Sequence, residues 1–429
     1  SCTLEVVQNA LESLVTQAYA HRAEVVKAFF ETESERLAKA CYEMARRFHR
    51  GGRILAFGVG SAATDAQHIS VEFVHPVIVG KKALPAIALP NDSPTLLGMS
   101  AEDPVSVFLR PLDLLGRPED IAIGLSPAKA DPGGPAVAAG LKQAEAKGFM
   151  TMGLSGPGET LAAAGPGWLF RCDDEDPDVV QEVHETLYHV LWELVHVFFD
   201  HRGLLEENPG GTRHDVGHSA FLYPFLSATE KGLDSVLEHV RSSILLKSQE
   251  VIEVRSQQMG RPQELVQAAR VIAERVRRGG KVLTFGNGGS ATDAQDFATD
   301  LMLPPTGMKP VPALSLTNEE AVVTAVANDV GFDNVFARQI IAYGEPEDVA
   351  VGISTSGGSH NHLSALAEAR RRGLATIALV GYGGGETVVK KLADLPLVID
   401  HDYIPRIQEA QATQYHLIRR LIDRIVSEN

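Results

Sequence analysis

Short hydrophobic runs alternate with longer amphipathic segments along this chain, and the alternation predicts its fold. The runs are of strand length, and each is followed by a stretch of helical character. Alternation of this kind with short connections predicts a parallel sheet covered by helices on both faces. The expected strands are 53–57, 86–89, 121–125 and 150–154 in the first half of the chain, and 281–285, 313–316, 348–353 and 375–380 in the second.

Longer segments predict a helical region at the start of each half and a long helix at its end. The expected helices are 34–49, 179–199, 263–277 and 405–427. The most hydrophobic stretch, 187–199, contains His189, Glu193 and His196. It is too short and too polar to span a bilayer, so we expect a buried or interface helix and no membrane partner.

The second half repeats the first. The segment FGVGSAATDAQ at 57–67 recurs as FGNGGSATDAQ at 285–295, so that Thr64 matches Thr292, 228 positions later. A repeat of that length in a chain of 429 residues indicates a tandem duplication. We therefore expect two domains, 1–207 and 208–429, joined near the turn Asn208-Pro209-Gly210-Gly211.

Composition narrows the classes of function. With 44% hydrophobic and 22% charged residues, the chain can form two ordinary cores of about 200 residues each. A formal charge of −16 lacks the basic surface that binds phosphate backbones, so no nucleic-acid partner is expected. Three cysteines without paired spacing indicate a reducing compartment and argue against a thiolate zinc site. The first residues show no secretory pattern, and we expect a cytoplasmic location.

Two turns in the second half have the composition of a phosphate cradle. Gly286-Asn287-Gly288-Gly289-Ser290 joins a strand to a helix, where glycines allow close approach of a ligand and Ser290 adds a hydroxyl. The turn 354–359 follows another strand and carries four hydroxyls, from Ser354, Thr355, Ser356 and Ser359. Tight packing at the first turn and a helix cap at the second are the alternatives, although a cap needs only one hydroxyl.

These two turns, together with Arg406-Ile407-Gln408-Glu409 at the start of the last helix, resemble the sugar isomerase (SIS) domain. Within that group the chain is most similar to the phosphoheptose isomerases, which make D-glycero-D-manno-heptose 7-phosphate from sedoheptulose 7-phosphate. The resemblance covers both halves and implies two tandem SIS domains in the α/β class, each with a doubly wound, Rossmann-like or flavodoxin-like parallel sheet. It also implies active sites shared between neighbouring subunits of a homotetramer, and in many members zinc.

The resemblance assigns the metal and acid–base roles residue by residue. In the first half the expected metal ligands are His68, Glu72, Gln181 and His189. Spacings of four and eight residues place each pair on one helical face, and His and Glu are plausible zinc ligands, although such pairs are more often ordinary surface or core residues. Asp178, Asn287 and Asp329 match positions that contact substrate.

Each half departs from the pattern at a different place. In the second half the corresponding set is Asp296, Asp300, Gln408 and His416, where loss of an imidazole and a shorter carboxylate predict a degenerate site that is weak for zinc or metal-free. In the first half Val59 replaces Asn287, and Ser126-Pro127-Ala128-Lys129-Ala130 replaces the hydroxyl-rich turn. One half thus has the expected catalytic set, and the other has the expected phosphate set.

Helix geometry favours a composite site. Ser290 and Asp300 are ten residues apart on one expected helix, or about 15 Å, which is too far for one sugar phosphate to reach both ends. We therefore expect the hydroxyls of Ser290, Ser354, Thr355, Ser356 and Ser359 to hold phosphate while the first-half set faces the reacting carbons, with one zinc ion per composite site.

The reaction expected for such a site is aldose–ketose isomerisation through an enediol. Glu72 would remove a proton beside the carbonyl and His189 would move a proton between the oxygens, while zinc would polarise the carbonyl. Because a glutamate that binds zinc is a poorer base, His189 is the alternative base.

Two other functions stay open from the sequence. One is a non-catalytic SIS sensor or adaptor that binds a sugar phosphate or a protein. The other is an enzyme acting on a different phosphorylated sugar. Two domains per chain predict a homodimer that mimics a tetramer of single domains, with 187–199 and 415–426 as candidate interface helices.

Overall fold

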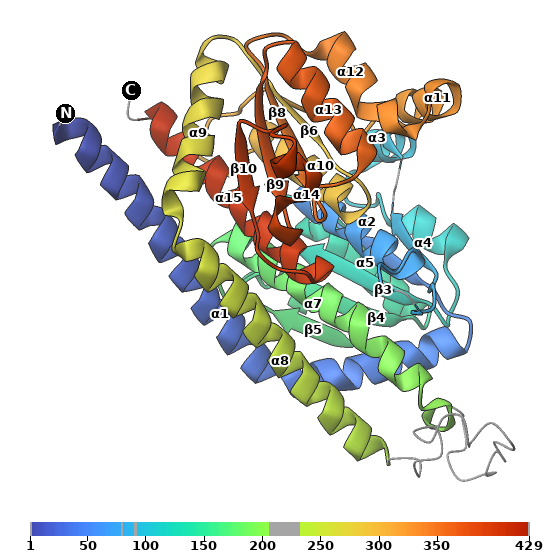
Figure 1. Ribbon diagram of the computed structural model, residues 1–429. Helices are drawn as coiled ribbons and strands as arrows, with labels where there is room; N and C mark the ends of the chain where they lie inside the picture. Colours follow the sequence, from blue (N-terminus) through green and yellow to red (C-terminus); the bar gives the residue numbers. More distant parts are fainter. Residues whose placement is uncertain (1, 79, 90–91, 206–231, 428–429) are drawn as a thin grey trace, which may run out of the picture.

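The computed structural model describes residues 2–78, 80–89, 92–205 and 232–427, and Figure 1 shows two α/β units joined by long helices. Each unit contains a five-stranded, all-parallel sheet, with the order β2-β1-β3-β4-β5 in the first half and β10-β9-β8-β6-β7 in the second. The predicted α/β class with two doubly wound parallel sheets is confirmed. The predicted boundary at 207/208 lies outside the described residues.

The strands fall where the hydrophobic runs predict them, and each sheet has one more strand than expected. The first sheet contains β1 (Ile54–Phe57), β2 (Ala86–Leu89), β3 (Ile121–Ser126), β4 (Met150–Ser155) and β5 (Trp168–Arg171). The second contains β6 (Val282–Phe285), β7 (Ala313–Ser315), β8 (Val349–Ser354), β9 (Ala375–Val380) and β10 (Leu395–Val398). The additional strands β5 and β10 are half-exposed edge strands, which lack the continuous apolar run of a central strand.

Helices cover both faces of each sheet. Those of the first half are α1 (Cys2–His49), α2 (Ser61–Val74), α3 (Ser93–Glu102), α4 (Leu109–Leu115), α5 (Gly134–Ala146), α6 (Thr160–Ala164) and α7 (Pro177–Phe199). Those of the second are α8 (Leu233–Met259), α9 (Pro262–Arg277), α10 (Gly289–Met302), α11 (Glu320–Val330), α12 (Val335–Tyr343), α13 (His360–Arg371), α14 (Gly385–Val389) and α15 (Ile404–Ser427). No helix among the described residues is long and apolar enough to cross a membrane.

The long helices α1 and α8 exchange their first halves between the two units. Leu11, Val15 and Tyr19 of α1 belong to the hydrophobic core of the second half. Val236 and Val240 of α8 belong to the core of the first half. Figure 1 shows α1 and α8 side by side along one edge of the molecule. Each core is therefore completed by a helix from the other half of the chain.

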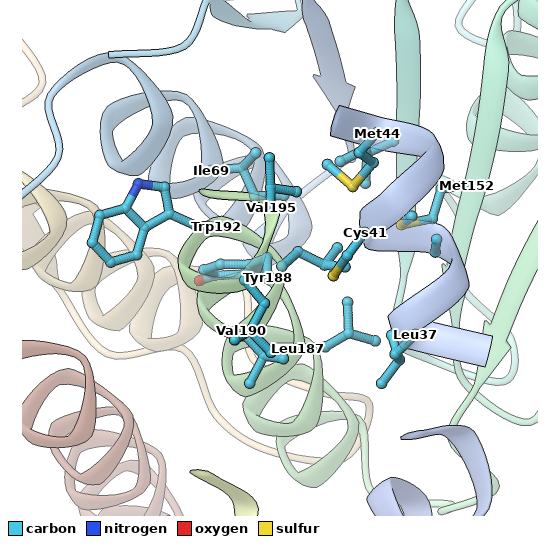
Figure 2. Packing of buried hydrophobic residues seen from close by; sticks show 14 of the residues in the cluster. Leu37, Cys41, Met44, Ile69, Met152, Leu187, Tyr188, Val190, Trp192 and Val195 are labelled. Carbon is cyan, nitrogen blue, oxygen red and sulfur yellow. The ribbon is translucent and has the colours of Figure 1, made fainter. Parts of the chain in front are cut away.

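Helices α7 and α15 lie inside the chain. One face of α7 packs Leu187 and Val190 toward Leu37 and Cys41 of α1 (Figure 2). Most side chains of α7 and α15 are buried within the single chain, so 187–199 is the buried helix of the two alternatives. The expectation that 187–199 and 415–426 lie at a dimer interface is therefore wrong, because both helices pack against other elements of the same chain. The two helices contact each other, α2 contacts α10, and these contacts position the site residues.

Candidate functional site

Three of the predicted ligands converge where α2 meets α7. His68 Nε2 lies 3.5 Å from Glu72 Oε1 and 3.4 Å from His189 Nε2. All three side chains are at most 2% exposed. We call this group, His68, Glu72 and His189, the first cluster; its ligand atoms lie within 4.8 Å of one another, close enough to share a metal ion.

Carboxylates from the second half face the outer nitrogens of both histidines. Glu409 Oε1 is 2.9 Å from His189 Nδ1, and Asp293 Oδ1 is 3.8 Å from His68 Nδ1. The contact with Glu409 directs His189 Nε2 into the cluster. Burial, together with repulsion from His68, lowers the pKa of His189 to about 3, so its imidazole is neutral and can offer a lone pair to a metal.

The glutamine beside the first cluster comes from the second half. A Cβ atom added to Gly289 would lie 2.1 Å from Gln408 Nε2 and 2.7 Å from His68 Nε2, so the glycine turn, Gln408 and His68 meet at one point. The predicted Gln181 lines a small buried cavity together with His68, but it faces the second-half residues and donates to Asp296 Oδ2 at 2.9 Å. The two residues Gln181 and His189 are about 12 Å apart along α7, and Gln181 faces Asp296, whereas His189 faces His68.

The donor set of the first cluster suits zinc. Two imidazole nitrogens and a carboxylate are common zinc ligands, and Gln408 can add an amide oxygen if its amide is turned over. Glu72 Oε2 and Gln408 Oε1 are buried without a hydrogen-bond partner, as expected of atoms whose partner is an ion. Cys41 and Cys172 are free and buried, and Cys41 lies in an apolar core, where it is no ligand.

The predicted phosphate turns lie at the start of helices α10 and α13, beside α15. Gly357 N donates to Ser354 Oγ at 3.0 Å and Gly358 N donates to Ser356 Oγ at 3.2 Å. Ser356 is exposed, whereas Ser290 is buried. Gln411 of α15 donates to the Ser354 carbonyl at 3.3 Å, which connects this turn to the helix that carries Gln408.

The remaining predicted substrate contacts are dispersed. The Asn287 and Asn361 side-chain amides donate to each other's oxygens at 2.9 and 2.8 Å, which ties the glycine turn to α13. Asp329 is exposed at the end of α11 and accepts a hydrogen bond from Asn328. Asp178 lies 3.0 Å from Arg420 Nε and close to His416, away from the first cluster.

Comparison with known proteins identifies the family of the chain. The family model described as "SIS domain" matches residues 18–156 and again 247–381. The chain belongs to the SIS domain family. Phosphoheptose isomerases are among its relatives: that of Solidesulfovibrio magneticus is 46% identical over 167 residues, covering 38% of this chain and 80% of the relative. That of Chlorobium phaeobacteroides is 40% identical over 206 residues, covering 47% of this chain and 89% of the relative.

Solved structures of similar fold span nearly the whole chain. The C-terminal domain of glucosamine-fructose-6-phosphate aminotransferase from Francisella tularensis aligns with a TM-score of 0.57 at 11% identity, over 96% of this chain and 95% of that one. The tagatose-6-phosphate ketose/aldose isomerase of Escherichia coli aligns with a TM-score of 0.54 at 13% identity, over 97% and 94%. These likenesses establish the tandem SIS fold. The closer sequence relatives support a phosphosugar isomerase.

In the first SIS domain, the turn that corresponds to the predicted phosphate turn 354–359 is occupied by its own carboxylate. Asp131 Oδ2 accepts from Ser126 Oγ at 2.6 Å, and Asp131 Oδ1 accepts from Gly133 N at 2.8 Å. The cavity at this turn holds only about 10 Å³, room for about one water molecule. Sequence reasoning missed Asp131, although it stands where Ser359 stands in the second SIS domain, and that substitution was the available signal.

The predicted degenerate residues form a second group related to the first cluster by the repeat. His416 Nε2 lies 3.6 Å from both Asp296 Oδ2 and Asp300 Oδ2. His416 Nδ1 is 2.9 Å from Glu182 Oε1, as His189 Nδ1 is from Glu409. Gln408, which the sequence places in this group, lies beside the first cluster instead, because the start of each long helix reaches the other domain's site.

Proposed function

We propose that the protein is an aldose–ketose isomerase that converts sedoheptulose 7-phosphate to D-glycero-D-manno-heptose 7-phosphate at a site composed of both SIS domains. The proposal is supported chiefly by the meeting of Gly289 and Gln408 of the second domain with His68 of the first. This meeting puts the glycine turn of the proposed phosphate-binding domain next to the proposed acid–base set.

In this proposal the substrate phosphate is held by the second domain. The hydroxyls of Ser290, Ser354, Thr355, Ser356 and Ser359 and the amides at the start of the following helices would bind its oxygens. The first domain would not compete for that phosphate, since Asp131 already occupies its cradle.

The first cluster would carry out the proton transfers. Glu72 takes a proton from C1 of the ketose and returns it to C2, while His189, neutral in the resting site, moves a proton from the C1 hydroxyl to the C2 oxygen. Glu409 keeps His189 in one tautomer and would stabilise its charged form. His68, Glu72 and Gln408 would hold a zinc ion, which would polarise the substrate carbonyl. His189 Nε2 would be its fourth ligand in the resting site and would leave the ion when it takes up the proton, since Glu409 already engages Nδ1.

Glu72 has two proposed roles, ligand and base. Its Oε1 faces His68, whereas its Oε2 is buried without a hydrogen-bond partner. Glu72 could therefore bind zinc through Oε1 and accept a proton on Oε2. His189 is the alternative base.

A non-catalytic sugar-phosphate sensor is the second candidate, and the burial of the first cluster favours it. His189 is 0% exposed, so a sugar carbon could reach it only if the site opened. Metal-free protein should be incubated with sedoheptulose 7-phosphate, with and without zinc, and aldose formation followed. Turnover that zinc restores supports the isomerase; binding without turnover, in the presence of zinc, supports the sensor.

We also propose that the chain forms a homodimer, and that it works in the cytoplasm, where the free thiols of Cys41 and Cys172 stay reduced. A dimer would supply four SIS domains, as the family resemblance implies. Light scattering should then give twice the chain mass of 46.1 kDa.

A further inference from the structure

The second group of ligand-type residues is built from both domains and differs chemically from the first cluster. We define the second cluster as Asp178, Asp296, Asp300 and His416. The ligand atoms of Asp178, Asp300 and His416 lie within 4.8 Å of one another, and Asp296 Oδ2 lies 3.6 Å from His416 Nε2. The cluster thus offers one nitrogen and three carboxylates, against two nitrogens and one carboxylate in the first.

His416 points an unsatisfied nitrogen into this cluster. The residue is 1% exposed, and its Nε2 has no hydrogen-bond partner. Its other nitrogen, Nδ1, is fixed by Glu182, whose own oxygens contact Arg22 at 3.0 Å and Thr413 at 2.6 Å. A histidine held by a buried carboxylate on one side and left without a partner on the other has the arrangement of a metal ligand.

The carboxylates of the second cluster are also held in place from outside. Ser61 Oγ donates to Asp300 Oδ1 at 2.6 Å. Gln181 Nε2 and Tyr415 OH donate to Asp296 Oδ2 at 2.9 and 2.8 Å. These donors leave Asp300 Oδ2 facing His416 and Asp296 Oδ1 without a partner. The oxygens therefore have fixed positions and free lone pairs.

The protein balances the charges of the second cluster only in part. Asp178 has Arg420 at 3.0 Å, and Glu182 has Arg22 at 3.0 Å. In contrast, within the described parts of the chain His416 is the only basic side chain at ion-pair distance from Asp296 or Asp300. Two buried carboxylates that share one histidine are costly, and a divalent cation would neutralise both.

We propose that the second cluster binds a hard divalent cation such as Mn²⁺ or Mg²⁺, at a site distinct from the first cluster. Carboxylate oxygens with a single imidazole favour these ions, whereas a nitrogen-rich set favours zinc. The ion would join Asp178 of the first domain to Asp300 and His416 of the second, and would so hold the two domains together. This proposal does not depend on the isomerase activity.

Binding of Mn²⁺ to the second cluster tests this proposal. We expect metal-free full-length protein to bind Mn²⁺, seen as loss of the free-ion resonance in electron paramagnetic spectra. Asp300→Asn should weaken that binding at least tenfold. The matched control Glu72→Gln alters the first cluster and should leave Mn²⁺ binding unchanged. No binding by the wild-type chain, equal binding by Asp300→Asn, or loss in Glu72→Gln would each overturn the proposal.

Two further measurements keep the test independent of misfolding. Asp178→Asn changes a ligand at the edge of the cluster, with a side chain 12% exposed, and should weaken Mn²⁺ binding while the metal-free variant keeps the wild-type circular dichroism spectrum. The bound ion should show hyperfine coupling to one histidine nitrogen, that of His416. Coupling to two would place the ion on His68 and His189 and contradict the assignment. Sugar turnover does not enter either result, so failure of the isomerase proposal would be seen separately.

Discussion

His189 of the first SIS domain and Glu409 of the second are held together by a contact of 2.9 Å between Nδ1 and Oε1. Both side chains are at most 1% exposed. The proposed zinc ligand is thus oriented by a residue that lies 220 positions further along the chain.

Glu409 should therefore influence zinc binding by orienting the ligand His189. Glu409→Gln removes the charge that fixes the tautomer of His189, and we expect zinc affinity to fall by about 10–100-fold. Competition with a chromophoric chelator measures it. Glu182→Gln is the matched control, because Glu182 holds His416 instead; an equal loss of zinc affinity in that variant would contradict the assignment.

Gln181 and Gln408 occupy equivalent positions in the repeat, but only Gln408 should affect zinc binding at the first cluster. Gln408→Ala removes the amide beside His68, so it should weaken zinc binding at the first cluster by about tenfold or more. Gln181→Ala removes a donor to Asp296 and should leave zinc binding unchanged. The same chelator competition compares them, and the reverse ranking would restore the grouping expected from the sequence.

The two serine-containing turns should also differ. Ser356→Ala removes a hydroxyl from the open turn of the second domain, and losing a hydrogen bond to a phosphate costs about 1.5–3 kcal/mol. The KM for the sugar phosphate should therefore rise about tenfold or more. Ser126→Ala, in the turn that Asp131 fills, should leave KM unchanged; a rise there would show that the first cradle also binds substrate.

Because α1 and α8 exchange their first halves, a destabilising substitution in one half of the chain should loosen the core of the other half. Leu11→Ala should lower the free energy of unfolding by about 2–5 kcal/mol, because Leu11 is 3% exposed in the second core. Hydrogen exchange should then accelerate in α9. Val240→Ala is the reciprocal variant and should accelerate exchange in the first domain. If each variant loosened only its own half, the exchange of helices would be refuted.

His362 should make stability depend on pH. It is 0% exposed with neither ring nitrogen hydrogen-bonded, and burial lowers its pKa to about 4. Between its ordinary pKa of 6.5 and about 4 the unfolded chain binds a proton that the folded chain does not, so stability falls as pH falls through this window. Denaturant unfolding at pH values from 7 to 4 gives the free energy of unfolding as a function of pH. In His362→Leu this free energy should fall less steeply than in the wild type, by up to about 1.4 kcal/mol per pH unit. Equal slopes would contradict the assignment.

Much of the fold could be predicted from the sequence because it depends on local patterns. The central strands are short apolar runs between helices, and the displacement between Thr64 and Thr292 marks the repeat directly. The edge strands β5 and β10 were missed because half-exposed strands lack that signal. Residues 2–33 of α1 were also missed, since their apolar face packs partly on the other domain.

The sequence by itself determined the tandem SIS fold and the types of residue that could bind phosphate and metal. Only the tertiary structure decided how they group. His68, Glu72 and His189 meet because α2 and α7 cross, but Gln408 joins them and Gln181 does not, since the start of each long helix reaches the other domain. A pattern along one chain segment specifies which face a residue occupies; which residue of the other domain lies opposite depends on how the helices pack.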